Sequence, residues 1–411
     1  MKEPAVSVRT CALVLCMSFG AFALSVQVST LFKPGIATTP LLYDSKVCIE
    51  DFVQGSYRLR LVDASSGTAQ ELRNNMTAYL WPLAYGGTHA AWIGYSTGSG
   101  GPGGDPATGG IPISYYVQTI NATSKTELKV ADNIYYIERL AAAANRVAWT
   151  DYRYFTASDT TVEIYLYDFS SGSQKRITSQ KGYKSAPYIM GNQIVWQDYR
   201  NAAADPKNAD IYLYDLGASQ EKAICTNSAY QDQPSVYNNI VVWQDYRNAG
   251  SNPKNADIYM RDLSTGTERA ICTAAGWQAY PRIHGNIIVW QDYRNATTDT
   301  ANADIYLYDL ATNTETAITT KAGYQSEPFL YGSTVVWLDY TDNTIYKAVI
   351  SSSSVKAGFK PSTGRCGIAH AKLMIAPGAV GQTKDRLPCS AVSGRRIARR
   401  GSGIAPGAYV Q

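Results

Sequence analysis

A triplet of aspartate, tyrosine and arginine is the polar motif that recurs most often in this chain. It occurs as Asp151-Tyr152-Arg153, Asp198-Tyr199-Arg200, Asp245-Tyr246-Arg247 and Asp292-Tyr293-Arg294. A second acid follows twelve residues after each aspartate, at Glu163, Asp210, Asp257 and Asp304. Carboxylates and guanidinium groups gathered at one end of a repeated fold could bind a cation or a charged ligand.

The repetition itself favours a structural role for these residues. An active site needs one asymmetric group of side chains, whereas a motif present in every repeat is typical of a scaffold, in which aspartate accepts loop N–H bonds and arginine pairs with the acid. Loop sequences such as residues 205–210 lack the glycine and the terminal glutamate of an EF-hand. We therefore expect no metal and no cofactor, and retain the four Asp/Arg pairs as candidate binding residues at one mouth of the fold.

Aromatic residues in the linkers between repeats are the second group of candidates. Tyr183, Tyr230, Trp277 and Tyr324 each stand four residues before a proline that begins the next repeat. The linkers and the loops that follow the triplets share one face of the predicted fold. Amphipathic rings on that face could stack on a glycan or on a protein partner.

Catalysis has little support in the sequence. The chain has three histidines, His89, His284 and His370, and no G-x-S-x-G nucleophile motif. The glycine-rich stretch Gly98–Gly104 is not followed by the Lys-Ser/Thr of a phosphate-binding loop. The sequence therefore predicts a protein that is not an enzyme.

The elements that position these residues are revealed by tryptophans at a fixed spacing. Trp149, Trp196, Trp243, Trp290 and Trp337 stand 47 residues apart, and Trp92 and Ile49 occupy the same slot in two more divergent upstream repeats. Such a period indicates one supersecondary unit repeated along the chain. Each tryptophan is flanked by Val and Ile or by Ala, so we expect all six to lie in the core between neighbouring repeats.

Each repeat divides into four short strands. In one repeat they are expected at Pro234–Tyr237, Ile240–Tyr246, Asp257–Asp262 and Glu268–Cys272, with a tight turn at Asn238-Asn239. Four antiparallel strands repeated seven times predict an all-β fold, a seven-bladed β-propeller spanning residues 40–350. The last repeat lacks a clear fourth strand. We expect Val26–Phe32, in the segment 24–39, to supply it and close the ring, or else Ser351–Phe359.

The shared phrase I-x-W-x-D-x-R, followed by D-I-Y-x-x-D, resembles the repeat of TolB-like β-propellers. The resemblance covers residues 40–350, and it is closest to the versions in cell-surface and surface-layer proteins of methanogenic archaea. It implies a propeller outside the cytoplasm that binds other molecules of the cell envelope.

The two ends of the chain differ from the repeats. Residues 1–23 resemble a secretory signal, with Lys2 and Arg9 before the apolar run 11–20 and Ala21-Phe22-Ala23 as the cleavage site; an uncleaved anchor is the alternative. Residues 351–411 hold ten Lys/Arg and one acid, which predicts either a disordered basic tail or the product of an out-of-frame gene end. The rest of the chain has a net charge of −5, which argues against nucleic acid as a partner.

These observations predict a secreted or cell-surface propeller that acts as a non-enzymatic protein- or glycan-binding scaffold of the envelope. Its partner would be an envelope protein or a surface glycan, the propeller would be monomeric, and no segment beyond the N-terminal signal would enter a membrane. The alternatives are a carbohydrate-active enzyme or lectin that uses the mouth, and a periplasmic TolB-like partner of an envelope complex. Glycosylation sequons at Asn75, Asn121 and Asn295 fit an exported chain.

Overall fold

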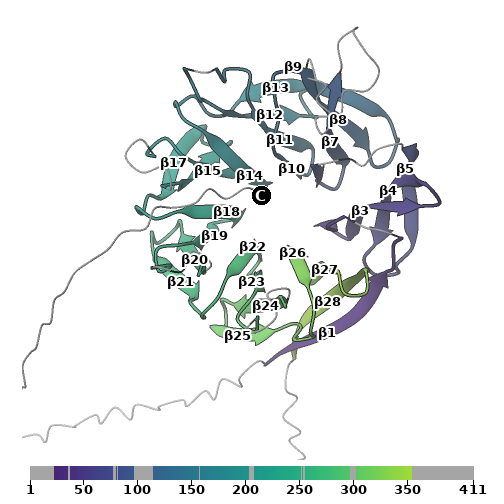
Figure 1. Cartoon of the computed structure of the whole chain (residues 1–411), viewed down its shortest axis with the longest axis vertical. Helices are drawn as coiled ribbons and strands as arrows, with labels where there is room; N and C mark the ends of the chain where they lie inside the picture. The colour runs from purple at the N-terminus through teal and green to yellow at the C-terminus, as the bar shows by residue number, and fades with distance from the viewer. Residues whose placement is uncertain are drawn as a thin grey trace, which may run out of the picture. The chain divides into compact units, whose positions relative to one another are not determined.

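The fold is a closed ring of seven β-sheets. The computed structural model describes residues 23–35, 38–76, 80, 82–96, 114–156, 158–202, 208–250, 252, 255–296 and 302–353. In these residues the seven sheets each have four antiparallel strands and stand as blades around a centre (Figure 1). The predicted seven-bladed β-propeller is confirmed. Residues 1–22, the glycine-rich stretch and the chain after Ser353 lie outside the described residues.

The first three blades are more divergent in sequence than the next three. Blade one contains β2 (Leu41–Tyr43), β3 (Lys46–Val53), β4 (Ser56–Asp63) and β5 (Ala69–Met76). Blade two contains β6 (Leu83–Tyr85), β7 (His89–Ser96), β8 (Ser114–Asn121) and β9 (Glu127–Ile134). Blade three contains β10 (Leu140–Ala143), β11 (Arg146–Asp151), β12 (Glu163–Asp168) and β13 (Ser173–Arg176).

Blades four to six repeat one pattern closely. Blade four contains β14 (Lys184–Met190), β15 (Gln193–Asp198), β16 (Asp210–Asp215) and β17 (Gln220–Cys225). Blade five contains β18 (Gln231–Tyr237), β19 (Ile240–Asp245), β20 (Asp257–Asp262) and β21 (Glu268–Cys272). Blade six contains β22 (Gln278–His284), β23 (Ile287–Asp292), β24 (Asp304–Asp309) and β25 (Thr314–Ala317). In each blade the first strand lies nearest the centre of the ring (Figure 1).

The seventh blade joins the two ends of the propeller. It contains β26 (Gln325–Tyr331), β27 (Thr334–Asp339) and β28 (Thr344–Ser353), and its fourth, outermost strand is β1 (Ala23–Phe32) from the other end. The pairing of β1 with β28 is antiparallel and runs from Ala23 opposite Ser353 to Phe32 opposite Ile345. Because β1 offers a partner along this length, β28 continues three residues beyond Ile350, where the sequence analysis placed the end of the propeller.

The hairpin between the first and second strands is fixed by residues that tolerate a left-handed backbone. Gly191, Asn238, Gly285 and Gly332 occupy the same turn position in blades four to seven, with φ between 50° and 60°. Glycine and asparagine adopt positive φ at the lowest cost, which is why this position alternates between them.

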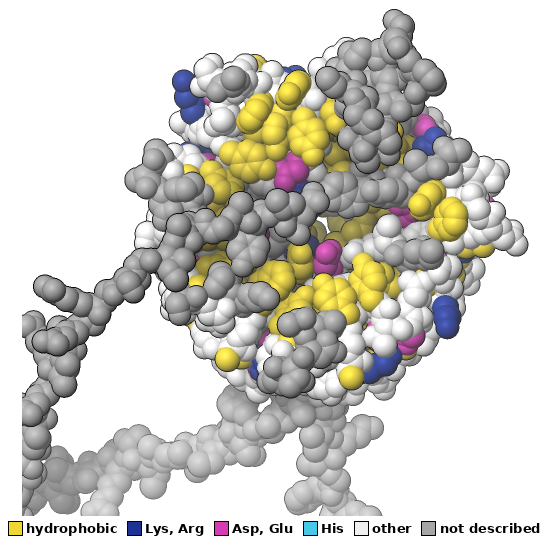
Figure 2. Space-filling view, viewed as in Figure 1, with side chains coloured by type: hydrophobic (Ala, Val, Ile, Leu, Met, Phe, Trp, Pro, Cys, Tyr) yellow, Lys and Arg dark blue, Asp and Glu magenta, His cyan; other side chains and the backbone are white. Residues whose placement is uncertain are grey.

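One face of the ring carries a concentration of apolar and aromatic side chains. Figure 2 shows hydrophobic side chains, the class that includes tyrosine, gathered around the hollow centre of the ring, with acidic side chains among them. Lysine and arginine side chains lie mainly toward the periphery in this view.

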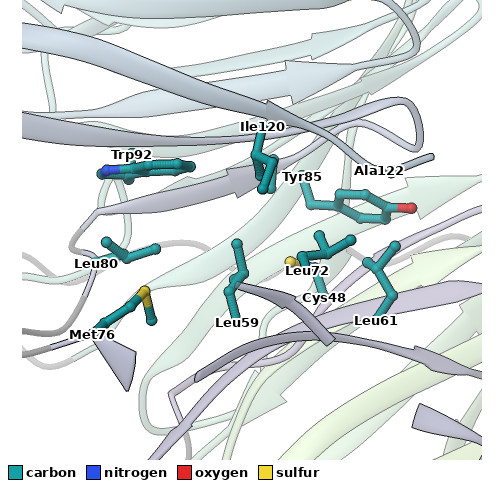
Figure 3. Close-up of a cluster of buried hydrophobic side chains, with 11 residues drawn as sticks. Cys48, Leu59, Leu61, Leu72, Met76, Leu80, Tyr85, Trp92, Ile120 and Ala122 are labelled. Carbon is teal, nitrogen blue, oxygen red and sulfur yellow. The ribbon is translucent and has the colours of Figure 1, made fainter. Parts of the chain in front are cut away.

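The hydrophobic core lies between neighbouring blades rather than within one. Trp149, Trp196, Trp243 and Trp290 are fully buried, and each packs in a cluster shared with the preceding blade. The cluster around Trp92 shows the arrangement for blades one and two, where side chains from β3, β4 and β5 meet others from β7 and β8 (Figure 3). Trp337 closes the same type of contact between blades six and seven. The ring is therefore held together by seven interfaces between sheets.

Candidate functional site

The Asp-Tyr-Arg triplet forms the same hydrogen-bonded unit in each of the regular blades. We call this unit the bracket: the buried aspartate carboxylate together with the tryptophan and the arginine that donate to it. In blade five, Asp245 is fully buried, and its Oδ1 accepts the backbone N–H of Arg247 at 2.8 Å and its Nε at 2.9 Å. Oδ2 accepts the indole N–H of Trp243 at 2.7 Å and Nη2 of Arg247 at 2.7 Å. Both carboxylate oxygens are thus occupied by protein donors, which leaves Asp245 no free position for a ligand.

The arginine of the triplet extends toward the outside of the blade. The guanidinium of Arg247 lies 4.1 Å above the ring of Tyr259, and its Nη1 reaches Glu268 on the outermost strand β21 at 2.7 Å. Tyr259 in turn stacks on Trp243, which it faces across β19 and β20. The bracket therefore fastens the second strand of the blade to the fourth.

The same bracket recurs with small changes in the other blades. Asp198 with Arg200 and Asp292 with Arg294 repeat the ion pair at 2.6 Å and 2.7 Å, with Glu221 and Glu315 as the outer acids. In blade three, Asp151 and Arg153 pair at 2.7 Å. In blade seven, Lys321 replaces the missing arginine and donates to Asp339 at 3.0 Å.

The acids and arginines expected at the mouth are bonded to partners in their own blades and do not line the central cavity described below. Arg247 reaches Glu268 on the outermost strand, and Tyr246 is the member of the triplet that packs against the linker residue Tyr230. The second acids are also enclosed: Asp210, Asp257 and Asp304 are buried and accept bonds from Asn201, Asn248 and Asn295.

The tyrosines of the triplets and the aromatic linker residues form a belt around the mouth. Neighbouring ring centroids in the belt lie 4.9 to 6.4 Å apart, within the usual range for aromatic pairs. We define the aromatic belt as two arcs, the first made of Tyr95, Tyr115, Tyr136, Tyr152, Tyr183, Tyr199, Tyr230 and Tyr246, and the second of Trp277, Tyr293, Tyr324 and Tyr340. All four linker residues singled out from the sequence belong to it.

Hydroxyl contacts connect the belt from blade to blade. The hydroxyls of Tyr199 and Tyr230 lie 3.2 Å apart, and so do those of Tyr293 and Tyr324. Burial raises the pKa of Tyr246 to about 12, so the ring keeps its proton at neutral pH. The belt is thus an amphipathic surface of neutral rings that can both stack and hydrogen-bond.

A cavity of about 330 Å³ lies inside the ring of innermost strands. Its lining comes from all seven blades and includes Leu41, Leu83, Leu140, Pro187, Pro234, Arg282 and Phe329. The belt comes close to this cavity at β18, where the hydroxyl of Tyr230 lies 3.5 Å from the carboxylate of Asp232 and the next residue, Gln233, lines the cavity. Burial raises the pKa of both Asp232 and Glu327 above the usual carboxyl range.

The innermost strands of blades four to seven are bent at the level of the cavity. Each has a β-bulge at an X-Pro pair, where the residue before the proline takes a positive φ: 47° at Ala186, 49° at Gln233, 53° at Tyr280 and 40° at Glu327. Positive φ is costly for side chains of these types, and bulges re-aim the side chains that they carry. All four residues line the cavity.

These bulge residues differ from blade to blade although their surroundings are nearly identical. The 47-residue spacing places Arg139 of blade three in the same slot, so the slot presents a guanidinium, a methyl group, an amide, a phenol and a carboxylate in turn. The slot two residues further holds Tyr188, Ser235, Arg282 and Phe329. The residues that differ between blades, as a specific site requires, therefore lie in the cavity. They were not among the candidates from the sequence, which were chosen because they repeat.

The described residues contain neither a metal-binding cluster nor a membrane-spanning helix. No group of three or more His, Cys, Asp and Glu residues in the described ranges could hold a metal ion. No helix among the described residues has the length and apolar character needed to cross a membrane.

The three glycosylation sequons differ in how their asparagine side chains are bonded. Asn295 donates its Nδ2 to Asp304 at 2.8 Å, and Asn121 accepts two backbone N–H groups at its Oδ1, whereas Asn75 is exposed with no side-chain hydrogen bond to a described residue. Since glycans attach at Nδ2, Asn75 has the most available amide of the three sequons.

Comparisons with known proteins show the fold alone. No family model matches the chain, and no curated protein matches it. Among solved structures, the β-propeller domain of the Trilobed protease from Pyrococcus furiosus matches with a TM-score of 0.52 and 9% identity, over 76% of this chain and 95% of that domain. Oligogalacturonate lyase from Vibrio parahaemolyticus matches with a TM-score of 0.52 and 9% identity, over 80% and 97%. TolB from Acinetobacter baumannii has a TM-score of 0.41 and 15% identity, over 79% of each chain. The two matches with a TM-score of 0.52 agree with the β-propeller fold of the chain.

Proposed function

We propose that this chain is a secreted or cell-surface propeller that binds a partner without catalysing a reaction, and that the aromatic belt is its binding surface. The observation that carries the proposal is the belt itself. In blades three to seven the linkers and the residues that follow the second strands supply its rings in alternation. Tyrosine and tryptophan are enriched in protein interfaces because they give a large contact area at a low cost in conformational entropy.

The role of the repeated acids supports a non-enzymatic function. Asp198, Asp245 and Asp292 are fully buried, and each is bonded to a tryptophan and an arginine of its own blade. Their carboxylates fasten the blades and contact no cavity. The most repeated polar residues of the chain are thereby accounted for by structure.

The partner that fits the belt is an envelope protein or a surface glycan. Half-buried rings with free edges and paired hydroxyls can stack on a sugar ring or pack against a protein surface. A location outside the cytoplasm is supported by the signal-like N-terminus and by the resemblance to surface-layer propellers of methanogenic archaea. A periplasmic TolB-like role in an envelope complex belongs to the same class of function.

One observation favours a second candidate function, a carbohydrate-active enzyme. Glu327 lines the cavity and Asp232 adjoins the lining residue Gln233, and burial raises the pKa of each carboxyl, which suits a general acid. Incubating the full chain with polysaccharides and measuring new reducing ends or unsaturated products tests this candidate. Turnover that is lost in both Asp232→Asn and Glu327→Gln would establish it in place of the binding role.

The binding proposal is tested with variants at the exposed ends of the belt. Tyr95 and Tyr340 are 46% and 51% exposed, so replacing them with serine removes contact area at little cost to the fold. Tyr154, 44% exposed and outside the belt, gives a matched control. The full chain is applied to a glycan array and to isolated envelope proteins. We expect a specific partner whose affinity falls tenfold or more in the Tyr95→Ser/Tyr340→Ser variant and is unchanged in Tyr154→Ser. Equal binding by all three proteins would contradict the proposal.

A further inference from the structure

One of the two arginines that line the cavity, Arg282, stands at a slot where the sister blades have other residue types. Arg282 follows the bulge proline of β22, at the slot that holds Tyr188, Ser235 and Phe329 in the sister blades. The fold thus accepts a phenol, a hydroxyl or a phenyl ring at this position. The fold therefore does not require an arginine here, which suggests that Arg282 binds a chemical group that the sister residues do not bind.

The guanidinium of Arg282 is poorly satisfied by the protein. Its Nη1 donates to the carbonyl of Pro281 at 3.0 Å, and its Nε is buried without a hydrogen-bond partner. The rings of Tyr188 and Phe329 lie 5.5 and 5.1 Å from its Cζ on opposite sides of the cavity. Among the described residues it forms no ion pair. Arginine keeps its charge in proteins, so a half-buried cation with spare donors is left facing the cavity.

The other charged groups around the cavity do not neutralise Arg282 by contact. Glu327, on the neighbouring blade, is its nearest acid in electrostatic terms, and Arg139 acts on both Glu327 and Asp232. The two carboxylates and two guanidiniums come from blades three, five, six and seven. This leaves Arg282 able to accept a further anionic group, with Glu327 and Asp232 placed to receive donors from the same ligand.

The shape of the cavity restricts what can enter. Beyond Arg282 the rings of Tyr43, Tyr237, His284 and Tyr331 form a continuous cluster, with centroid distances of 4.1 to 4.8 Å. Tyr43 also lies against Gly87 of the next blade, where an added Cβ would come within 2.7 Å of its ring. None of these four rings lines the cavity, whereas the lining residue Gln233 adjoins Asp232, the partner of the belt residue Tyr230. A volume of about 330 Å³ admits a slender group end-on and excludes a folded domain.

We propose that the cavity binds a carboxylate, with Arg282 as the residue that receives it. The carboxylate enters from the belt face and takes the free Nε and Nη donors of Arg282, while Tyr188 and Phe329 pack against the apolar atoms next to it. Gln233, Tyr280 and Glu327 at the strained bulges supply polar contacts to the rest of the group. An acidic sugar and the carboxyl end of a polypeptide both present this chemistry. The inference rests on the proposed binding function, since it names the group that the belt face would receive.

The test compares acids with their neutral counterparts on the full chain. Isothermal titration is carried out with D-galacturonate against D-galactose, and with N-acetyl-trialanine against its C-terminal amide. We expect the acid of at least one pair to bind tenfold or more tightly than its neutral counterpart, and the pair that responds identifies the source of the carboxylate. Equal binding within both pairs, or no binding in either, would overturn the proposal.

Variants at Arg282 make the assignment specific. Arg282→Ser installs the residue of blade five, so the variant is expected to fold, and its melting temperature checks this. It should lose the preference for the acid. Arg269, a half-buried arginine 5.5 Å from the ring of Tyr308 on the outside of the ring of blades, provides the control, and Arg269→Ser should keep the preference. An unchanged preference in Arg282→Ser would refute the carboxylate site. If that variant still depends on Tyr95 and Tyr340 for partner binding, the belt proposal survives on its own.

Discussion

Replacing Asp245 by asparagine should lower the free energy of unfolding by about 2–4 kcal/mol. The carboxylate accepts four hydrogen bonds, two at each oxygen, from Trp243 and Arg247. In the variant one oxygen becomes an NH₂ group, which faces N–H donors and can accept none of them. Whichever way the amide is turned, two of the four bonds are lost.

The size of the loss in unfolding free energy follows from the donors of Trp243 and Arg247 that are left without an acceptor. A buried donor without a partner costs about 1–3 kcal/mol, and removing one member of a buried ion pair costs about 3–5 kcal/mol. Arg247 is 20% exposed and keeps Glu268 at 2.7 Å, so part of its charge stays compensated and the second figure is an upper bound. We therefore expect Asp245→Asn to lower the free energy of unfolding by about 2–4 kcal/mol in total.

The assay is equilibrium unfolding in urea of three parallel variants, Asp198→Asn, Asp245→Asn and Asp292→Asn. Each bracket keeps the same tryptophan and arginine partners, although Asp198 lacks the bond from the arginine Nε, so the three losses should agree within about 1 kcal/mol, with partner binding retained in each folded variant. A loss below about 0.5 kcal/mol would refute the structural role of the bracket. One variant that loses function while its sisters do not would show that an aspartate acts in chemistry.

Three further predictions concern the core, one buried acid and the closure of the ring. Trp243→Ala should cost about 3–5 kcal/mol, with faster hydrogen exchange centred on blades four and five, whose shared cluster it empties; unaltered exchange there would contradict this packing. Burial raises the pKa of Glu50 from its usual 4.5 to about 7, so the folded chain holds a proton that the unfolded chain has released, and stability falls as pH rises through this window. Relative to the wild type, Glu50→Gln should therefore gain up to about 3 kcal/mol between pH 4.5 and 8, measured by urea unfolding at each pH; a constant difference would show that the carboxyl is not buried. Deleting residues 24–32 exposes the edge of β28 and removes Leu31 from the cluster between blades seven and one, so the melting temperature should fall and the chain should associate, as size-exclusion chromatography would show; an unchanged monomer would mean that β1 is dispensable.

The architecture could be predicted from the sequence because its signals are periodic. The spacing of Trp149, Trp196, Trp243, Trp290 and Trp337 gives the repeat, and the turn residues Gly191, Asn238 and Gly285 divide it into strands. The strands predicted at Asp257–Asp262 and Glu268–Cys272 agree with β20 and β21 to the residue. A segment near residue 26 was expected to close the ring because the last repeat lacked a strand.

The location of the site could be predicted only in part. Tyr230 and Trp277 were expected at the mouth and pack in the aromatic belt, whereas Asp245 and Arg247, expected beside them, are bonded within their own blade. The bulge at Tyr280 has no signal in its own residue type, because tyrosine does not favour positive φ. What the sequence did contain was variation at one slot beside a repeated proline.

The measurement that tests the central claim most directly is hydrogen exchange of the full chain with and without its bound partner. The account predicts protection on the belt face in several blades at once, at the linkers before β14, β18, β22 and β26 that carry Tyr183, Tyr230, Trp277 and Tyr324. Protection confined to the outer strands β17, β21 and β25, or to the opposite face around Tyr43 and Tyr331, would show that the partner binds elsewhere and would contradict the claim.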